Sequence, residues 1–393
     1  MINTTYYQDL TKMNTFGMKV KARCFIEYDS VADLVDIEFG ELARPVLHIG
    51  GGSNLLFTDD FRGTILHSKI NFIEILDECH SVPETPSQVN LGPSPYPGVG
   101  KCPLHTNGIS SDEKVLVSVG AGVVFDDFCD WAAKEGLWGV ENLSYIPGEV
   151  GASAVQNIGA YGVEVKDVIK TVYCYDTIDE EFVNFDVEDL EYGYRDSAFK
   201  DPEIKGRYVV THVVFALSRT PQPKLDYGHL KEAVLAAIPT VISSPSPVIS
   251  SEVEKSLTPA LIRKTIIKIR KDKLPEPSVM GSAGSFFKNP VISAEHFASI
   301  EAAAKAEQGA DYKVPHYDLP DGTVKVPAAW LIEQCGWKGK RSGGAAVYDK
   351  QPLVIVNYTG EAYPEEIIGL ERRIIASVKS KFDIILHPEV EHI

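Results

Sequence analysis

The chain has 393 residues, a formal net charge of −17 at pH 7, 44% hydrophobic residues and 24% charged residues. This length is too great for one ordinary hydrophobic core, and it predicts a globular protein of two or three domains. The negative charge argues against general nucleic-acid binding, which needs basic patches, and no apolar run reaches the roughly 18 residues that a membrane-spanning helix needs.

Most of the predicted strands lie in the first two thirds of the chain. Runs rich in Val, Ile, Leu and aromatic residues predict strands over residues 45–50, 63–68, 114–120, 169–176 and 207–218. Within this part, a helix is expected to begin near Val124, because apolar side chains recur three and four residues apart, and Gly136 is suited to end it.

Three helices are predicted in the last third, and each has a proline near its start. Thr258 and Pro259 are suited to the N-cap and first helical position of one helix, and Pro327 and Pro364 begin the other two. Residues 79–112 and 241–257 are instead rich in Pro, Gly and Ser and lack periodicity, so they predict surface insertions or mobile loops. The remaining pattern predicts an α+β fold.

Two further features bear on the compartment. The first 17 residues contain no apolar core of a signal peptide, so we expect none. The six cysteines are scattered and lack CxxC spacing, which is typical of reduced thiols and not of a disulfide framework. We therefore expect a cytoplasmic protein.

A run of three glycines follows the first predicted strand, in "HIGGGSNLLF" over residues 48–57. A dinucleotide fingerprint would need glycine where Leu55 stands and a helix after the loop, and no lysine follows as in a P-loop. The segment predicts a corner between two strands, whose backbone amides and Ser53 and Asn54 side chains are suited to hold a pyrophosphate.

A second glycine-rich segment is "ENLSYIPGEVGASAVQNIGAYGVE", residues 141–164. It is too long and too poor in charge for an ordinary exposed loop, and it has too little periodicity for a long helix. Its small residues allow the backbone to lie close to a large partner. A segment that packs on the protein's own sheet is the alternative.

The segment "GSAGSFFKNP", residues 281–290, sets Ser285 among glycines and follows it with two phenylalanines. Glycine permits a tight turn, and the aromatic pair anchors it in a core, so we expect a turn that presents Ser285. The alternative is an ordinary turn that enters a strand. The end "HPEVEH", residues 387–392, lacks helical H-x-x-x-H spacing, so we expect no metal there and interpret it as a solvated tail.

These segments are among eight motifs that occur in a fixed order along the chain and together indicate one protein family. The chain resembles the UDP-N-acetylenolpyruvoylglucosamine reductase family over nearly its whole length, apart from the two insertions. The motifs are "NTFG", "GGGSNLLF", "VGAGV", "ENLSYIPGEVGASAVQNIGAYGVE", "YGYRDSAFK", "KLPEP", "GSAGSFFKNP" and "GGAAVY". The segment "LDYGHL" further resembles the subgroup with a substrate-covering tyrosine loop, in which Tyr227 would be the covering residue.

The resemblance implies an FAD-binding fold of the vanillyl-alcohol oxidase type with a smaller α/β substrate-binding domain. It implies FAD-binding subdomains over residues 1–75 and 114–223, an insertion over 76–113, and a C-terminal domain over 224–393 whose last residues return to the active site. Some enzymes of the wider superfamily attach FAD through a histidine beside the glycine loop. Serine or asparagine stands there in this chain, so we expect non-covalent FAD.

The implied reaction is the NADPH-dependent reduction of an enolpyruvyl ether to a lactyl ether on a UDP-sugar, a step of peptidoglycan precursor synthesis. Such a reaction needs a proton donor and a group that meets negative charge developing on the substrate carboxylate. By resemblance, Ser285 is the proton donor, and Arg195 and Glu389 meet the carboxylate, with Glu389 acting protonated. The family has an acidic residue where this chain has His387, which puts the local charge in doubt.

The resemblance also assigns binding residues. Those for the substrate are Tyr194, Tyr227, Lys273 and Asn289. Those for FAD are Gly50, Gly51, Gly52, Ser53, Asn54, Gly120, Pro147, Gly148, Gly151, Ala152, Ser153, Asn157, Gly159 and Ala160. We expect Lys273 on a loop after a helix; its alternative role is a cation that complements the end of that helix.

Two other functions remain open at this point. The same fold could carry a flavin oxidase, which would consume dioxygen and need no NADPH. A flavin or nucleotide-sugar sensor would have kept the scaffold without catalysis, although Ser285, Arg195 and Glu389 are all present. From the resemblance alone we expect a monomer. The net charge and the lack of a long apolar run lead us to expect no nucleic-acid or membrane partner.

Overall fold

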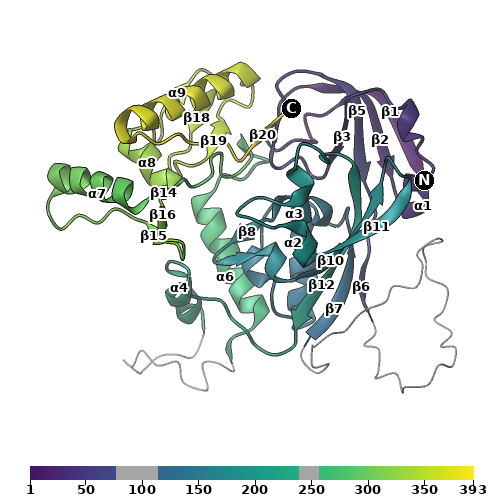
Figure 1. The fold of residues 1–393 in the computed structure, drawn as a ribbon, viewed down its shortest axis with the longest axis horizontal. Helices are drawn as coiled ribbons and strands as arrows, with labels where there is room; N and C mark the ends of the chain where they lie inside the picture. The colour runs from purple at the N-terminus through teal and green to yellow at the C-terminus, as the bar shows by residue number, and fades with distance from the viewer. Residues whose placement is uncertain (77–113, 239–255) are drawn as a thin grey trace. The chain divides into compact units, whose positions relative to one another are not determined.

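The computed structural model describes residues 1–76, 114–238 and 256–393 (Figure 1). The predicted insertions lie outside these residues, apart from residues 76, 256 and 257. Two compact units share the chain. Unit 1 comprises Met1–Gln8, Ala22–Gly51 and Arg62–Arg270; unit 2 comprises Asp9–Lys21, Gly52–Phe61 and Lys271–Ile393. The predicted domain boundary at residue 223 stays a prediction.

The first sheet has the strand order β1-β2-β5-β3. Its strands are β1 (Ile2–Asp9), β2 (Lys21–Tyr28), β5 (Phe61–Ser68) and β3 (Val46–Ile49). β3 runs parallel to β5, so the glycine loop that follows β3 leaves the same end of the sheet as the end of β5. A buried cluster that includes Leu34 and Leu66 joins the short helix α1 (Val31–Val35) to this sheet.

The second sheet is antiparallel, with the order β11-β10-β12-β7-β6. Its strands are β6 (Ile73–Ile75), β7 (Lys114–Gly120), β10 (Ile169–Asp176), β11 (Glu181–Asp186) and β12 (Tyr208–Ser218). β7, β10 and β12 match predicted strands, and α3 (Val150–Gln156) contacts β12 and β7 (Figure 1).

The helices of unit 1 confirm the predicted starts. α2 (Phe125–Lys134) has Val124 as its N-cap, and it ends two residues before Gly136, whose φ is +69°. α6 (Pro259–Lys273) begins where predicted, and the Thr258 hydroxyl accepts a hydrogen bond from the Leu261 amide at 3.1 Å. α4 (Leu230–Ala236) and α6 share an apolar cluster.

Unit 2 contains a sheet of order β13-β19-β18-β17, which α9 (Pro364–Phe382) covers (Figure 1). Its strands are β13 (Gly281–Ser282), β17 (Arg341–Ser342), β18 (Ala345–Val347) and β19 (Ile355–Asn357). α8 (Ala328–Gln334) contacts α9. The periodicity that predicts α9 is confirmed by its buried side chains at Ile367, Leu370, Ile374 and Val378.

Smaller elements complete unit 2. A three-stranded sheet of β14 (Val291–Ser293), β16 (Thr323–Lys325) and β15 (Tyr317–Asp318) adjoins α7 (Ala294–Gln308). β20 (Glu391–His392) pairs in parallel with β4 (Leu55–Leu56). The short elements of unit 1 are β8 (Gly159–Ala160), β9 (Val163–Glu164) and 3₁₀ turns at Phe39–Glu41, Glu141–Leu143, Val165–Asp167, Val187–Leu190 and Ala198–Lys200.

The described residues form no helix with the length and apolar character needed to cross a membrane. Over the same ranges, no three His, Cys, Asp or Glu side chains come together as a metal site would require. Cys24, Cys129, Cys174 and Cys335 are free thiols. Burial raises the pKa of all four, most strongly at the fully buried Cys129 and Cys174, so these thiols are poor nucleophiles.

Candidate active site

The two glycine-rich segments meet in unit 1, although about 100 residues separate them. A Cβ built on Gly51 would lie 3.5 Å from the Cα of Gly148, an ordinary van der Waals distance. A Cβ built on Gly50 would lie 3.1 Å from Glu149 Oε2 and 3.3 Å from the Cβ of Ala152. Two backbones therefore face each other with few side chains between them, which fits close approach to an anionic diphosphate.

Other predicted FAD-binding glycines are required by the packing of the chain on itself. A Cβ on Gly52, whose φ is +60°, would lie 2.0 Å from the Met13 carbonyl oxygen. On Gly120 it would lie 2.4 Å from the Ile70 carbonyl oxygen, and on Gly151 it would lie 2.9 Å from the Cβ of Ala121. At these positions the protein's own atoms fill the space that a side chain would need.

The polar side chains of the second glycine-rich segment hold the segment itself. Asn157 is fully buried with a φ of +46°, and its amide donates to the Gly193 carbonyl at 2.7 Å and to Glu164 Oε2 at 3.1 Å. The Ser153 hydroxyl donates to the Val150 carbonyl at 2.7 Å within α3. These two side chains therefore bind groups of the protein itself, as expected for the alternative in which the segment packs on the protein's own sheet.

Arg195 lies against the same segment of unit 1. Its Nη2 donates to the Gly159 carbonyl at 2.5 Å, and its Nη1 donates to the Asn157 carbonyl at 3.4 Å. The Arg195 φ is +58°, and its guanidinium lies 5.2 Å from the centre of the Tyr194 ring. These two contacts hold the guanidinium, a planar group with five N–H donors, against the glycine-rich segment.

Tyr227 also contacts the glycine-rich segment. Its ring centre lies 6.0 Å from that of Tyr161 in an edge-to-face arrangement, and 45% of the residue is exposed. The Leu230 amide donates to the Tyr227 carbonyl at 3.2 Å, and Gly228 between them has a φ of +55°. The predicted tyrosine loop is thus a tight turn that leads into α4.

The Ser285 turn has the predicted local structure. Ser285 is exposed, whereas Phe286 and Phe287 are 0% and 1% exposed. Gly284 has a φ of +68°, which a residue with a side chain rarely adopts. The Phe286 ring packs 6.2 Å from that of Phe16, which belongs to the "NTFG" motif. The turn therefore presents its serine outward from an aromatic anchor.

The last residues of the chain pair with this turn inside unit 2. The Glu389 amide donates to the Phe286 carbonyl at 2.8 Å, and the Lys288 amide donates to the His387 carbonyl at 2.9 Å. The Asn54 side-chain amide donates to the Glu389 carbonyl at 3.0 Å. The prediction of a solvated tail is therefore wrong, because backbone pairing with two distant segments fixes the C-terminus.

Two of the predicted substrate-binding residues lie at the ends of helices. Lys273 is the last residue of α6, so its expected position on a loop is wrong. The helix continues because only Leu274, which precedes Pro275, is disfavoured in a helical conformation. The Asn289 side-chain oxygen accepts a hydrogen bond from the Ala328 amide at 2.9 Å, so this side chain caps the start of α8.

Arg270 is a site neighbour that the sequence did not reveal. Its Nε donates to the Tyr145 carbonyl at 3.1 Å, and its burial lowers the pKa of the guanidinium, partly offset by Tyr161 and Asp126. The only local signal is a cation within the apolar periodicity of α6. Arg270 therefore connects α6 to the glycine-rich segment that carries Tyr161.

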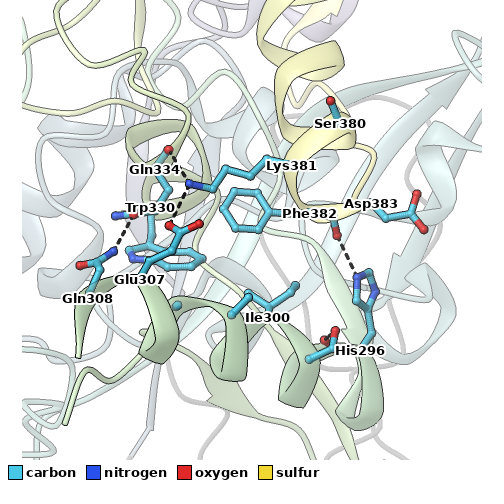
Figure 2. A pocket seen from close by; sticks show the side chains of 13 residues that line it. His296, Ile300, Glu307, Gln308, Trp330, Gln334, Ser380, Lys381, Phe382 and Asp383 are labelled. Atoms are coloured by element: carbon cyan, nitrogen blue, oxygen red, sulfur yellow. Dashed lines mark hydrogen bonds and ion pairs between the residues drawn. The ribbon is translucent and has the colours of Figure 1, made fainter. Parts of the chain in front are cut away.

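A pocket of about 470 Å³ lies elsewhere in unit 2, between α7, α8 and the end of α9 (Figure 2). Its lining includes Trp330 and Phe382 but none of the predicted site residues. Its polar groups largely bind one another: Lys381 Nζ lies 3.3 Å from the Gln334 carbonyl and 3.4 Å from Glu307 Oε2. It is therefore not the candidate active site.

Comparisons with known proteins place these features in a family. Residues 276–393 match the C-terminal domain of UDP-N-acetylenolpyruvoylglucosamine reductase, and residues 103–185 match an FAD-binding domain. The FAD-binding match confirms the expected α+β fold of the vanillyl-alcohol oxidase type. The structure of the Thermus caldophilus reductase is similar in fold, with a TM-score of 0.57, 21% identity, and coverage of 100% of this chain and 98% of that chain.

Curated relatives match over the whole length. The reductase of Bacteroides fragilis is 44% identical over 387 residues, 98% of each chain, and that of Porphyromonas gingivalis is 40% identical over 98% of this chain and 97% of its own. The expected FAD and NADPH dependence follows from this membership. The chain therefore belongs to the UDP-N-acetylenolpyruvoylglucosamine reductases, FAD-dependent oxidoreductases that reduce UDP-N-acetylglucosamine enolpyruvate to UDP-N-acetylmuramate in peptidoglycan synthesis.

Proposed function

We propose that Ser285 donates the proton in this reduction, and that Arg195 and Glu389 bind the substrate carboxylate. The observation that carries the proposal is the Ser285 turn: an exposed serine follows a left-handed glycine and precedes two buried phenylalanines. The Glu389 amide donates a hydrogen bond to the Phe286 carbonyl of that turn at 2.8 Å. This backbone contact supports a common role for Ser285 and Glu389, which are about 100 positions apart in sequence.

The FAD that the glycine-rich backbone would hold would supply hydride transfer, with NADPH as the hydride source and the vinyl carbon of the substrate as the acceptor. The adjacent carbon then needs a proton, and the Ser285 hydroxyl is the group proposed to give it. A serine hydroxyl is a weak acid, so it needs a strongly basic acceptor and a fixed position. The enolate-like substrate provides the acceptor, and the aromatic anchor of the turn fixes the hydroxyl.

Arg195 and Glu389 are proposed to stabilise the charge that develops on the substrate carboxylate. The Arg195 guanidinium has a planar fork of donors that matches a carboxylate, and its contacts with Gly159 and Asn157 hold it in position. An ionised Glu389 would repel the substrate carboxylate, so Glu389 is proposed to act protonated, as a hydrogen-bond donor.

Different residues are proposed to bind the cofactor and the substrate. The Gly50–Gly51 backbone, together with Gly148, would hold the FAD diphosphate without a covalent bond. Tyr194, Tyr227, Lys273 and Asn289 would bind the UDP-sugar. We further propose a monomer that acts in the cytoplasm, and that Tyr227 covers the bound substrate.

An anaerobic absorption titration of the full-length protein tests this function. NADPH is expected to bleach the flavin band, and UDP-N-acetylglucosamine enolpyruvate is expected to restore it. A band that bleaches but does not return would point to another electron acceptor. Turnover with dioxygen in place of the enolpyruvyl sugar would favour the oxidase alternative.

A further inference from the structure

His67, on β5 in unit 1, has a carboxylate at each ring nitrogen. Its Nδ1 lies 3.1 Å from Glu27 Oε1, and its Nε2 lies 3.0 Å from Glu149 Oε1. The His67 side chain is 4% exposed, and that of Glu149 is 12% exposed. None of these three residues belongs to the predicted site.

The two contacts determine the protonation of the ring. An ionised carboxylate only accepts hydrogen bonds, so each ring nitrogen must donate, and a histidine with two N–H groups is a cation. Burial acts to lower the pKa of His67, but the hydrogen bond and charge of Glu149 and the hydrogen bond of Glu27 raise it above its ordinary value. The geometry and the direction of the pKa shift both favour the imidazolium form of His67.

Glu149 connects this cation to the first glycine loop. Glu149 is the N-cap residue of α3, and its Oε2 lies 3.1 Å from the place of a Cβ on Gly50. The neighbouring residues Gly51 and Gly148 face each other at 3.5 Å by the same measure. One oxygen of Glu149 thus binds His67, and the other lies against the backbone that is proposed to hold the FAD diphosphate.

The charges in this cluster balance only when His67 is protonated. The groups around His67 are Glu149, Glu27 and Lys69, whose Nζ lies 3.7 Å from Glu27 Oε1. With imidazolium present, two cations offset two anions. Loss of its proton leaves a net negative charge next to a loop that must accept an anion, and opposes binding of that anion.

We propose that His67 is a positioning residue for FAD, which holds the Glu149 carboxylate beneath the glycine loop and neutralises it. This inference rests on the proposed binding of the FAD diphosphate by Gly50 and Gly51. It predicts that FAD affinity falls as the pH rises through the pKa of His67. The sign follows because the raised folded-state pKa makes the imidazolium contribution complete at low pH and absent at high pH.

The test is the Kd for FAD, measured by flavin fluorescence quenching on full-length apoprotein from about pH 6 to about pH 9. The wild type is expected to lose roughly 10- to 100-fold in affinity across this range, the effect of one uncompensated charge near a phosphate. His67→Gln keeps an amide group that can donate hydrogen bonds but removes the charge, so its FAD binding is expected to be weak and independent of pH.

Glu149→Gln supplies the decisive variant. It removes the carboxylate that needs compensation, so it should abolish the pH dependence while binding FAD at least as tightly as the wild type. In the His67→Gln background it should restore affinity. His296→Gln is the matched control, because the His296 ring binds the Phe382 carbonyl in unit 2, at 2.9 Å, and the pH profile of this variant should follow the wild type.

Thermal melts of each apoprotein establish whether it folds. If His67→Gln fails to fold, the Kd of Glu149→Gln and the pH dependence of the wild-type Kd still test the role of His67. A wild-type Kd that does not change with pH, or a Glu149→Gln variant as weak as His67→Gln, would overturn the proposal. Gly51→Ala distinguishes a failure of the His67 proposal from a failure of the proposed FAD-binding site. If it leaves the Kd unchanged, the glycine loop does not bind the diphosphate, and both proposals fail; if it weakens FAD, only the role of His67 is in question.

Discussion

The first glycine loop and the Ser285 turn have similar compositions but use glycine for different physical reasons. At Gly52 a side chain has no room, because the Met13 carbonyl occupies the position of its Cβ. At Gly284 a Cβ would meet nothing within 4 Å, and glycine is favoured only because φ is +68°. The loop is held by backbone against backbone, whereas the turn is held by the buried rings of Phe286 and Phe287.

This difference in how glycine is used suits the two regions to different functions. A loop of tightly packed backbone offers amide and carbonyl groups in fixed positions and few side chains, which suits a large cofactor that brings its own chemistry. A turn anchored by aromatic rings fixes a single side chain in space, which suits proton transfer. Substitutions in the two regions should therefore fail in different ways.

The largest effect is expected at the turn. Ser285→Ala should lower kcat by roughly 10²- to 10⁴-fold, the usual contribution of a general acid, with FAD affinity unchanged. Ser285→Cys keeps a protic side chain and should recover part of the activity. Steady-state NADPH oxidation checks both variants, and equal loss in Ala and Cys would argue that the hydroxyl positions substrate without donating a proton.

The glycine comparison predicts unequal losses of stability. Gly52→Ala should lower the free energy of unfolding by roughly 2–5 kcal/mol, because strain at positive φ adds to a backbone clash. Gly284→Ala should cost only about 1–2 kcal/mol, the strain alone. Urea unfolding of the two apoproteins measures the difference. Equal losses would mean that the loop moves to accommodate the methyl group.

At Glu389 the prediction concerns protonation. Glu389→Gln keeps an N–H donor, so kcat/KM should fall by less than about tenfold. Glu389→Ala should lower kcat/KM by roughly 100-fold, because the charged substrate carboxylate would lose a hydrogen-bond donor. Activity at saturating NADPH checks the pair. If Gln were as poor as Ala, Glu389 would act as a carboxylate and not as a donor.

The smallest effect concerns the scaffold of unit 1. Arg263 on α6 binds Asp126 and Asp130 on α2, with Nη2 to Asp126 Oδ2 at 3.0 Å and Nε to Asp130 Oδ1 at 3.1 Å. Arg263→Met keeps most of the aliphatic stem and should cost about 1–3 kcal/mol in unfolding free energy with kcat unchanged. Lys268→Met, on the same helix, is the surface control.

Local signals predicted the parts of the fold that local physics decides. The prolines at 259 and 364, with apolar periodicity, were sufficient for α6 and α9, and Gly284 with two phenylalanines was sufficient for the Ser285 turn. The end of α6 was misplaced because the helix continues to Lys273, the last position that the following Pro275 does not disfavour.

Long-range pairing accounts for the rest. The C-terminal residues resemble a polar tail because their partners, β4 and the Ser285 turn, lie far away in sequence. His67 resembles an ordinary core residue of a strand, since Glu27 and Glu149 are 40 and 82 positions away. No local pattern in a single sequence indicates which distant carboxylates a buried histidine will meet.

The role of Ser285 is tested most directly by anaerobic stopped-flow spectroscopy of Ser285→Ala beside the wild type, with the two half-reactions followed separately. Flavin reduction by NADPH should proceed at the wild-type rate, and reoxidation by UDP-N-acetylglucosamine enolpyruvate should slow by roughly 10²- to 10⁴-fold. Reoxidation at the wild-type rate would contradict the assignment of Ser285 as the proton donor.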